Sequence, residues 1–145
     1  MIRIAVQSDP IALVEVLGAI EATGMGGVAS FTGLVRADDG VRTLTLEHYP
    51  GMTEAALHDV AQAAAARWSL GAVTIIHRVG TMLPGDRIVF VGTAAAHRQA
   101  ALEACAYCID RLKTDAPFWK REATVQGDRW VEARGSDTAT AEGWG

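Results

Sequence analysis

The sequence has 145 residues, of which 50% are hydrophobic and 21% are charged. This length is typical of one ordinary domain and allows a single hydrophobic core to be buried. The composition excludes an intrinsically disordered chain, because such chains have too few apolar residues to form a core. The formal net charge of −4 disfavours nucleic acid as a partner, since proteins that neutralise many phosphates carry a basic surplus.

Cysteine usage and the first residues of the chain point to the cytoplasm. The two cysteines, Cys105 and Cys108, do not suggest a secreted disulfide framework, and free thiols suit a reducing compartment. The apolar stretch from Met1 to Val6 is too short for a signal peptide. No apolar run approaches the roughly 20 residues that a membrane-spanning helix needs. We therefore expect a cytoplasmic protein that does not enter the membrane.

The chain begins with a predicted strand and a predicted helix. Residues 2–7 alternate and are rich in β-branched side chains, which indicates a strand. Asp9 is suited to cap a helix, and Pro10 is suited to the first turn of one. Apolar side chains at helical spacing then predict an amphipathic helix over residues 10–22, which the following glycines end.

A hairpin and a second helix are predicted next. Residues 27–36 and 41–49 both indicate strands, and the turn sequence Asp38-Asp39-Gly40 between them predicts that the two strands pair as a β-hairpin. Thr53 is predicted to cap a helix that runs to about Trp68.

The second half of the chain predicts two strands, a third helix and a final hairpin. In order, these are strands 72–79 and 86–94, helix 98–112, and strands 118–125 and 129–133. The Pro84-Gly85 dipeptide predicts the turn between the first two strands. Pro117 must lie at or beyond the end of the helix, because proline does not continue a helix interior.

Hairpins interleaved with three helices predict an α+β fold, in which the helices lie against one face of a mixed sheet. The order does not show regular βαβ alternation, an internal repeat or a dividing linker. We expect a single domain over residues 1–135. The remaining residues, 136–145, are small and polar and are expected to form a mobile tail.

Basic residues gather at the predicted ends of helices and strands, where sites are commonly built on a rigid scaffold. His97 and Arg98 lie where a strand gives way to a helix. Backbone N–H groups at a helix start are unpaired, and an adjacent guanidinium binds phosphate through two parallel hydrogen bonds. The pair therefore indicates an anion site. The alternative is a solvated helix start whose arginine makes only surface ion pairs.

Lys113 and Lys120 are seven residues apart, with Pro117 between them. The break at the proline allows the following strand to carry Lys120 back toward Lys113. Two nearby ammonium groups repel each other, which leaves a fraction of them neutral for work as a base or nucleophile. The alternative is structural, with Lys113 complementing the C-terminal end of its helix and Lys120 exposed on a strand.

The motif Cys105-Ala106-Tyr107-Cys108 has the spacing of redox and zinc sites, but it lies within the predicted third helix. A reactive thiolate is favoured at a helix start, and zinc needs about two more ligands, so we interpret both cysteines as buried core residues. His48, His58 and His77 lack the spacing of metal ligands, and we interpret them as structural or surface residues. We expect no metal site.

Six segments in this order resemble the catalytic (large) subunit of the molybdopterin synthases. They are SFTGLVR at 30–36, LEHYPGM at 46–52, IHRVG at 76–80, AHR at 96–98, LKTDAPFWKRE at 112–122 and RWVEAR at 129–134. Each short segment alone is weak, whereas the ordered set and the long 112–122 block are specific. The first 25 residues match only loosely.

The resemblance implies a fold, a reaction and partners. The fold is an α/β hammerhead with an added antiparallel subdomain. The reaction converts cyclic pyranopterin monophosphate to molybdopterin by transferring two sulfurs, without a metal or cofactor. Sulfur arrives as a thiocarboxylate on the C-terminal Gly-Gly tail of a small ubiquitin-like subunit. The large subunit is a homodimer with one small subunit at each end, which makes a heterotetramer.

The resemblance also implies roles for individual residues. Lys113 and Lys120 match the catalytic lysines near the incoming thiocarboxylate. Substrate-binding positions are matched by Arg36, His97, Arg98, Arg121, Glu122 and Arg134. The last of these matches an arginine that reaches the site across the dimer. Some members have a lysine where this chain has Leu34, so a contact there is backbone only or absent.

Three other classes of function stay open on the residues alone. A non-catalytic module would use the same basic pocket to bind a phosphorylated metabolite and a partner's tail without transferring sulfur. A thiol redox protein would depend on Cys105 and Cys108. An RNA-binding α+β domain is disfavoured by the net acidity and by the lack of strands that combine aromatic and basic side chains.

Overall fold

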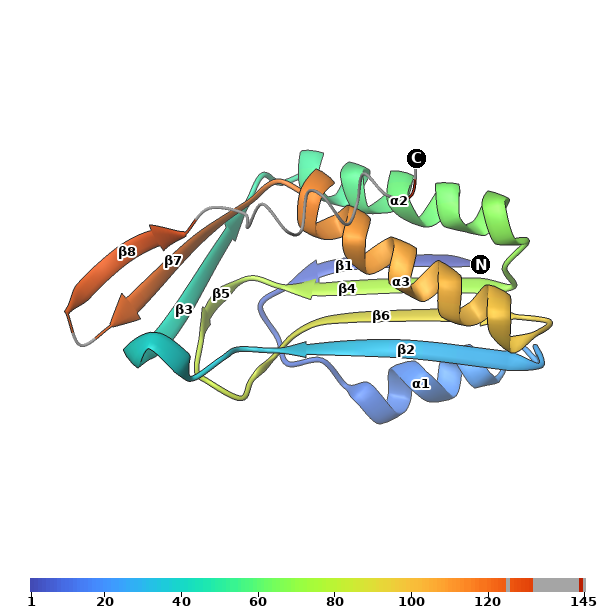
Figure 1. Cartoon of the computed structure of the whole chain (residues 1–145), viewed down its shortest axis with the longest axis horizontal. Coiled ribbons are helices and arrows are strands. Elements are labelled where there is room, and N and C mark those ends of the chain that lie inside the picture. Colours follow the sequence, from blue (N-terminus) through green and yellow to red (C-terminus); the bar gives the residue numbers. More distant parts are fainter. Residues whose placement is uncertain (125, 132–143, 145) are drawn as a thin grey trace.

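The structure is a computed structural model that describes residues 1–124, 126–131 and 144. In this part of the chain, three α-helices, one short 3-10 helix and two four-stranded sheets are arranged along a long axis (Figure 1). None of the helices described is long and apolar enough to span a bilayer. The predicted α+β class, with a mixed sheet, three helices and a second antiparallel sheet, is confirmed.

The first sheet has the strand order β1-β4-β6-β2. Its members are β1 (Ile2–Gln7), β4 (Ala72–Arg78), β6 (Arg87–Ala95) and β2 (Gly27–Leu34). The strands β1 and β4 are parallel, whereas β4 pairs with β6, and β6 with β2, in antiparallel fashion. The predictions of strands over 2–7, 72–79 and 86–94 are therefore confirmed.

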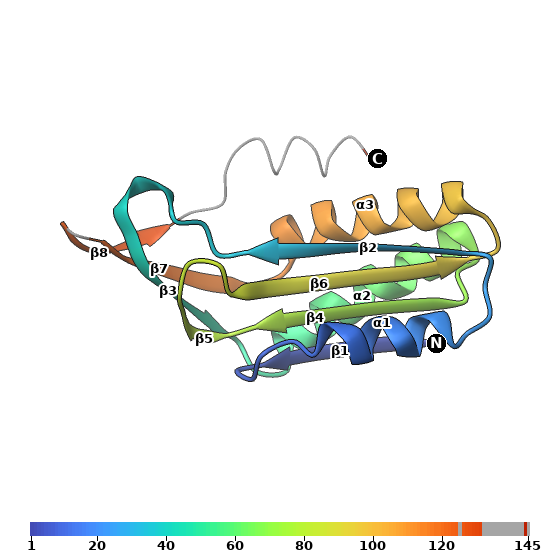
Figure 2. The ribbon, with the colours of Figure 1, turned by 90° about the horizontal axis from the view of Figure 1, so that it is seen from below.

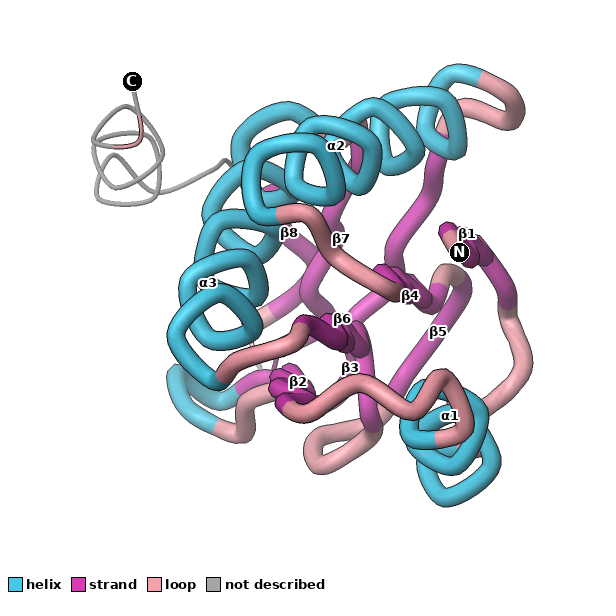
Figure 3. The backbone as a smooth tube through the Cα atoms, turned by 90° about the vertical axis from the view of Figure 1, so that its right-hand side faces the viewer, coloured by secondary structure: helices cyan, strands magenta, loops and turns pink. Residues whose placement is uncertain are grey.

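The three helices cover both faces of the first sheet. Helices α2 (Met52–Trp68) and α3 (Arg98–Asp115) lie on one face and α1 (Leu13–Glu21) lies on the other (Figures 2 and 3). The prediction that all helices share one face is wrong because β4 is apolar on both sides. Its Ile75 packs toward α2 and α3, while the next residue, Ile76, packs toward α1.

The first helix begins later than predicted. Its N-cap is Ala12, with no side-chain cap hydrogen bond, so the prediction that Asp9 caps the helix is wrong. The side-chain amide of Gln7 instead donates to the carbonyl oxygens of Asp9 and Pro10, at 3.1 and 3.3 Å. These bonds hold the segment as a turn, and the helix starts only after it.

The second sheet has the order β5-β3-β7-β8 and is antiparallel throughout. Its members are β5 (Gly80–Met82), β3 (Val41–His48), β7 (Phe118–Thr124) and β8 (Gly127–Val131). The predicted final hairpin is confirmed as β7–β8. The short strand β5 was not predicted.

The predicted hairpin of residues 27–36 with 41–49 is wrong. A 3-10 helix (Asp38–Gly40) separates the two strands, and β2 pairs with β6 in the first sheet while β3 belongs to the second sheet. Turn residues show that the chain changes direction, but they do not choose the partner of a strand. Pairing with β6 places Ala29 of β2 in the core beneath α2 and α3.

Hydrogen bonds at the start of helix α2 connect distant parts of the chain. Gly51, with φ of +87°, is the N-cap, and its N–H donates to the carboxylate of Glu54 at 3.0 Å, so the prediction of a Thr53 cap is wrong. The fully buried Thr53 hydroxyl instead donates to the carbonyl oxygen of Pro117, at 2.9 Å, and accepts from the backbone N–H of Tyr49, at 3.0 Å. It therefore ties together the end of β3, the start of α2 and the connection from α3 to β7.

The third helix and the chain after it agree with the sequence prediction. Helix α3 starts at Arg98 as predicted and extends to Asp115, three residues beyond the predicted end, and Pro117 lies past it. The tail predicted over residues 136–145 lies outside the described residues except for Trp144. The Trp144 indole N–H donates to the carboxylate of Asp110 at 2.6 Å, which places this residue against α3.

Replacing Thr53 tests the link between the two sheets. Thr53→Val keeps the shape of the side chain but leaves the Tyr49 N–H and the Pro117 carbonyl without this partner. We expect the free energy of unfolding to fall by about 2 kcal/mol in urea titrations, the cost of leaving buried polar groups unpaired. Thr53→Ser, the matched control, keeps the hydroxyl and should lose less. Equal stability of the valine variant and the wild type would contradict this role.

Candidate active site

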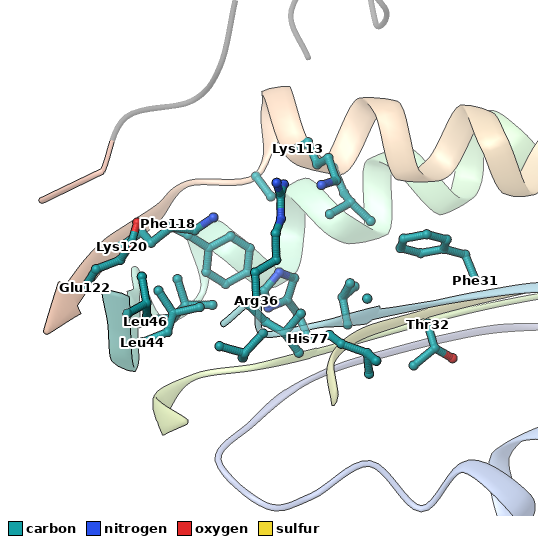
Figure 4. A pocket seen from close by; sticks show the side chains of 18 of the residues that line it. Phe31, Thr32, Arg36, Leu44, Leu46, His77, Lys113, Phe118, Lys120 and Glu122 are labelled. Atoms are coloured by element: carbon teal, nitrogen blue, oxygen red, sulfur yellow. The ribbon is translucent and has the colours of Figure 1, made fainter. Parts of the chain in front are cut away.

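A pocket of about 580 Å³ lies where the two sheets meet (Figure 4). Its walls come from the end of β2 and the loop after it, from β3, from the end of β4, from the last turn of α3 and from β7. Segments far apart in the sequence converge here because β3 and β7 pair with each other in the second sheet, next to the ends of β2, β4 and α3. The Thr53 contacts lie at the base of this junction.

The last turn of α3 and the strand β7 supply the two lysines of the pocket. Lys113 lies in the last turn of α3, which stops because Ala116 is extended, with φ of −81° and ψ of 123°. Side chains alternate along a strand, and Phe118, Lys120 and Glu122 of β7 line the pocket. The chain contains no lysines other than these two. Their convergence agrees with the expectation drawn from the break at Pro117.

Three cationic side chains reach the pocket from three elements. They belong to Lys113, Lys120 and Arg36, which follows β2 (Figure 4). All three are exposed to solvent in the single chain. Two acidic side chains also line the pocket, those of Asp38 and Glu122, and the Glu122 carboxylate pairs with the guanidinium of Arg129 at 3.3 Å. The pocket therefore suits an anion, and covering it would strengthen that preference because water would no longer screen the charges.

The structure does not bring all of the predicted residues to this pocket. His97 and Arg98 begin α3, and 15 residues at 1.5 Å each place Arg98 about 22 Å from Lys113 along the helix axis. Arg121 lies between two pocket-facing residues of β7, with its guanidinium 6.0 Å from the ring centre of Trp130. Arg134 lies outside the described residues.

The start of α3 lies close against the start of β2. A Cβ atom on Gly27 would lie 3.1 Å from both the backbone nitrogen of Arg98 and the backbone carbon of His97. His97 and Arg98 are nevertheless exposed, and His97 is an N-cap in extended conformation without a side-chain cap hydrogen bond. Both side chains therefore remain accessible at one end of β2, while Leu34 at the other end lines the pocket.

His77 lines the pocket, although its place in the sequence indicated only a structural or surface residue. It is 7% exposed, and its ring stacks on that of Phe118 with centroids 4.0 Å apart and planes at 26° (Figure 4). Its Nδ1 lies 2.9 Å from the carbonyl oxygen of Arg78. Burial lowers the pKa of His77 from 6.5 to about 4; the hydrogen bond to Arg78 opposes this shift, and the charges of Lys120 and Lys113 add to it.

The interpretation of the two cysteines as core residues is confirmed. Both thiols are free and buried within α3. Burial raises the pKa of Cys105 to about 11 and that of Cys108 to about 12, where the neighbouring Cys105 adds to the rise. They are therefore uncharged thiols at neutral pH and poor nucleophiles. Among the described residues, no three His, Cys, Asp or Glu side chains cluster as metal ligands.

Comparison with known proteins identifies the family. The family model described as "MoaE protein" matches residues 6–115. The molybdopterin synthase catalytic subunit of Salmonella typhimurium is 59% identical over 122 residues, which cover 82% of this chain and 81% of the relative. The chain belongs to the MoaE protein family. The family match includes Arg36, His77 and Lys113 and ends before β7, so the identification does not depend on Lys120.

Solved MoaE structures share the fold. The molybdopterin biosynthesis MoaE protein from Burkholderia ambifaria MC40-6 superimposes with a TM-score of 0.86 at 46% identity, covering 99% of this chain and 98% of that one. A protein–protein complex of subunits 1 and 2 of the molybdopterin-converting factor from Helicobacter pylori 26695 gives a TM-score of 0.75 at 21% identity. That match covers 92% of this chain and 91% of the other, and it shows similarity of fold.

The depressed pKa of His77 predicts a loss of stability in mild acid. Below pH 6.5 the unfolded chain binds a proton at His77, whereas the folded chain does so only near pH 4. The free energy of unfolding should therefore fall as the pH drops from 6.5 to 4, by about 3 kcal/mol from this residue. His77→Phe keeps a stacking ring and removes the titration, so its stability should fall less over this range.

Urea unfolding at a series of pH values measures this effect. His58 is exposed on α2 and provides the control, because His58→Phe should keep the pH dependence of the wild type. An unchanged pH dependence in His77→Phe would contradict a buried, neutral imidazole in the folded protein.

Proposed function

We propose that this chain is the catalytic subunit of a molybdopterin synthase. It converts cyclic pyranopterin monophosphate to molybdopterin with sulfur from the C-terminal thiocarboxylate of a small ubiquitin-like subunit. The observation that carries the proposal is the convergence of Arg36 and both lysines of the chain on one pocket, within a chain of the MoaE family. The reaction belongs in the cytoplasm, where the two buried thiols stay reduced.

The charges of the pocket match those of the reactants. The pterin substrate carries a phosphate and the sulfur donor is an anionic thiocarboxylate, so the two repel each other. Fixed positive charges aimed at the reacting groups lower the cost of bringing them together, most strongly where water is excluded. Arg36 binds the phosphate through paired hydrogen bonds, a geometry to which a guanidinium is suited. Glu122 is a second substrate-binding side chain on the pocket wall.

Lys113 and Lys120 are the catalytic residues of this proposal. Each can stabilise the negative charge that develops during sulfur transfer, and each can donate or accept the proton as the phosphate ester bonds of the substrate open. Placing the small subunit's tail beside the pterin adds the benefit of proximity. No cofactor is required for these steps.

The open pocket favours a partner that covers it. Because all three cations are solvent-exposed in the single chain, water screens their interaction with an anion. A Gly-Gly tail has no side chains beyond hydrogen, so it can pass close to the walls and exclude water from the lysines. Arg121, which is not among the pocket residues, would then contact the partner subunit or the rim of the site rather than the bound pterin.

A homodimer explains the distance between Arg98 and the pocket. Strand β2 lies at the edge of the first sheet and carries the exposed apolar side chains Val28, Phe31 and Leu34. Such edges commonly pair with another chain. Antiparallel pairing of two β2 strands would bring the start of one strand, beside its own Arg98, to the end of the other strand at the pocket.

The length of β2 agrees with antiparallel pairing of two β2 strands in the dimer. The eight residues of β2 span about 23 Å, close to the separation of Arg98 from Lys113 along α3. In the proposed dimer, each pocket therefore receives His97 and Arg98 of the partner subunit, and Arg134 of the partner subunit approaches it as well. With one small subunit at each end, the assembly is a heterotetramer.

Reconstitution tests the proposed reaction. The purified chain is mixed with a thiocarboxylated small subunit and the cyclic pterin precursor, and the dithiolene product is measured as its fluorescent oxidised derivative. We expect product with the wild type and a loss of at least about 100-fold with Lys113→Ala, the usual scale for removing an acid–base group. Arg3→Ala, an exposed change on β1, provides the control.

The outcomes separate the proposal from its rivals. A stable complex with the small subunit but no product would favour the non-catalytic binding module. Lys113→Arg distinguishes charge from proton transfer, because arginine keeps the charge and does not release its proton. Full turnover in Lys113→Ala with normal binding of the partner would remove this lysine from the mechanism.

Mixed dimers test whether Arg98 acts across the dimer. Lys113→Ala and Arg98→Ala are each expected to be inactive as homodimers. A hybrid dimer has one site with Lys113 of one copy and Arg98 of the other both intact, so about half of the wild-type activity should return. Hybrids are purified through two different affinity tags and assayed by reconstitution. Hybrids without activity would place both residues in the same copy's site.

A further inference from the structure

The outer surface of α2 and α3 holds one residue from beyond the second sheet. The two helices lie side by side over one face of the first sheet (Figures 1 and 3). Trp144 is the one residue after Val131 that the structure describes. Its indole N–H donates to the carboxylate of Asp110 on α3 at 2.6 Å, and its backbone carbonyl accepts from the guanidinium of Arg67 on α2 at 3.1 Å. Two charged side chains therefore bind the polar groups of this tryptophan.

Two aromatic rings contact the indole of Trp144. It meets the ring of Trp68 edge to face, with centroids 5.9 Å apart and planes at 83°, and the ring of Tyr107 at 5.7 Å and 87°. Such contacts are favourable because the positive edge of one ring meets the negative face of the other. The guanidinium of Arg67 lies 4.8 Å from the ring centre of Trp68 and 5.7 Å from that of Trp144, which allows cation–π attraction.

Contacts that do not involve Trp144 hold these rings in place. The indole N–H of Trp68 donates to the carboxylate of Glu103 at 3.0 Å, and that carboxylate also accepts from the side-chain amide of Gln99. The rings of Trp68 and Tyr107 lie 5.2 Å apart, and both pack against the core beneath the helices. Binding to groups that are already ordered costs less entropy. We therefore expect the site to keep its shape when no indole occupies it.

We propose that Arg67, Trp68, Tyr107 and Asp110 form a binding site for a tryptophan side chain, and that Trp144 of the same chain fills it as an anchor for the segment beyond β8. The polar contacts define the ligand, because a phenylalanine in the same place would have no N–H to donate to Asp110. None of the four side chains lines the pocket between the sheets, so this inference does not depend on the proposed function.

The anchor bears on the two elements that carry the lysines of the pocket. Asp110 lies three residues before Lys113, about 4.5 Å along the axis of α3. Lys120 of β7 pairs with Val131, the last residue of β8. The stretch from Asp110 to Trp144 therefore contains both lysines, and the anchor joins its two ends. Joining the ends of a segment disfavours its opened conformations, because they lose conformational freedom. The anchor should therefore oppose local opening of β7 and β8.

Nuclear magnetic resonance of the whole chain tests whether Trp144 occupies the site. The chain has four tryptophans, so the four indole N–H signals can be assigned from single variants. The Trp144 signal should shift in Asp110→Ala, and its N–H should exchange with water faster there than in the wild type. Asp115→Ala, the control, removes the other aspartate of α3, which is exposed, and should leave the signal unchanged. A Trp144 signal that resembles an unfolded chain and ignores Asp110→Ala would overturn the proposal.

A peptide tests whether the site binds tryptophan as a separate ligand. Trp144→Ala vacates the site in the whole chain, and a peptide with the sequence of residues 136–145 is then added. Short tethers give effective concentrations in the millimolar range, so a site that Trp144 fills should bind the free peptide with a Kd of about 1 mM or tighter. Adding Asp110→Ala should weaken this binding about tenfold, the usual scale for losing a hydrogen bond to a charged group.

Two comparisons make the peptide result specific. The wild type, whose own Trp144 fills the site, should bind the peptide more weakly than Trp144→Ala does. A peptide with phenylalanine in place of the tryptophan should also bind more weakly. Absence of saturable binding to Trp144→Ala at several millimolar peptide would contradict the proposal, because a site that weak would also stay unoccupied in the intact chain.

Amide hydrogen exchange tests the effect of the anchor on the second sheet. In Trp144→Ala, the amides of β7 and β8 should exchange at least about threefold faster than in the wild type, while those of β1 and β4 keep their rates. Leu102→Ala removes another exposed apolar side chain, on α3, and should leave all of these rates unchanged. Equal rates in β7 and β8 with and without Trp144 would show that this residue does not act as an anchor.

Discussion

A single buried hydroxyl joins the two halves of this molecule. Thr53 connects the end of β3, the first turn of α2 and the Pro117 carbonyl between α3 and β7 through two hydrogen bonds. Because β3 and β7 pair along their length, fixing both at this point sets how the second sheet leaves the first. The last turn of α3 and the start of β7 then have defined positions, and these two segments carry Lys113 and Lys120.

The pocket at this junction combines a buried aromatic pair with solvent-exposed cationic side chains. Its floor is a buried, neutral His77 stacked on Phe118, whereas Arg36 and the two lysines remain exposed. Exposed cations reduce the stability of the free protein only slightly, because water and salt screen their mutual repulsion. The same charges act strongly on an anion once another surface displaces the water. The single chain therefore holds a site whose electrostatic strength depends on its partners.

The local features of the fold could be predicted from the sequence, but the pairing of strands and the contacts between distant residues could not. Helix α3 and its end before Pro117 follow from periodicity and from the geometry of proline. The pairing of β2 with β6 instead of β3 depends on the distant core beneath α2 and α3, which turn residues do not report. His77 was missed because a lone histidine in a strand has no spacing to recognise. Only the register that places it against Phe118 reveals its surroundings.

The two faces of β7 restrict how this strand can change length during evolution. Phe118, Lys120 and Glu122 line the pocket, while the alternating Trp119 contacts Tyr49 and Trp130 instead. Inserting or deleting one residue before Lys120 would exchange the two sets, turning the lysine away from the pocket and an indole into it. A change of two residues would preserve the alternation. Insertions or deletions between Pro117 and Lys120 must therefore change the length of this segment by an even number of residues.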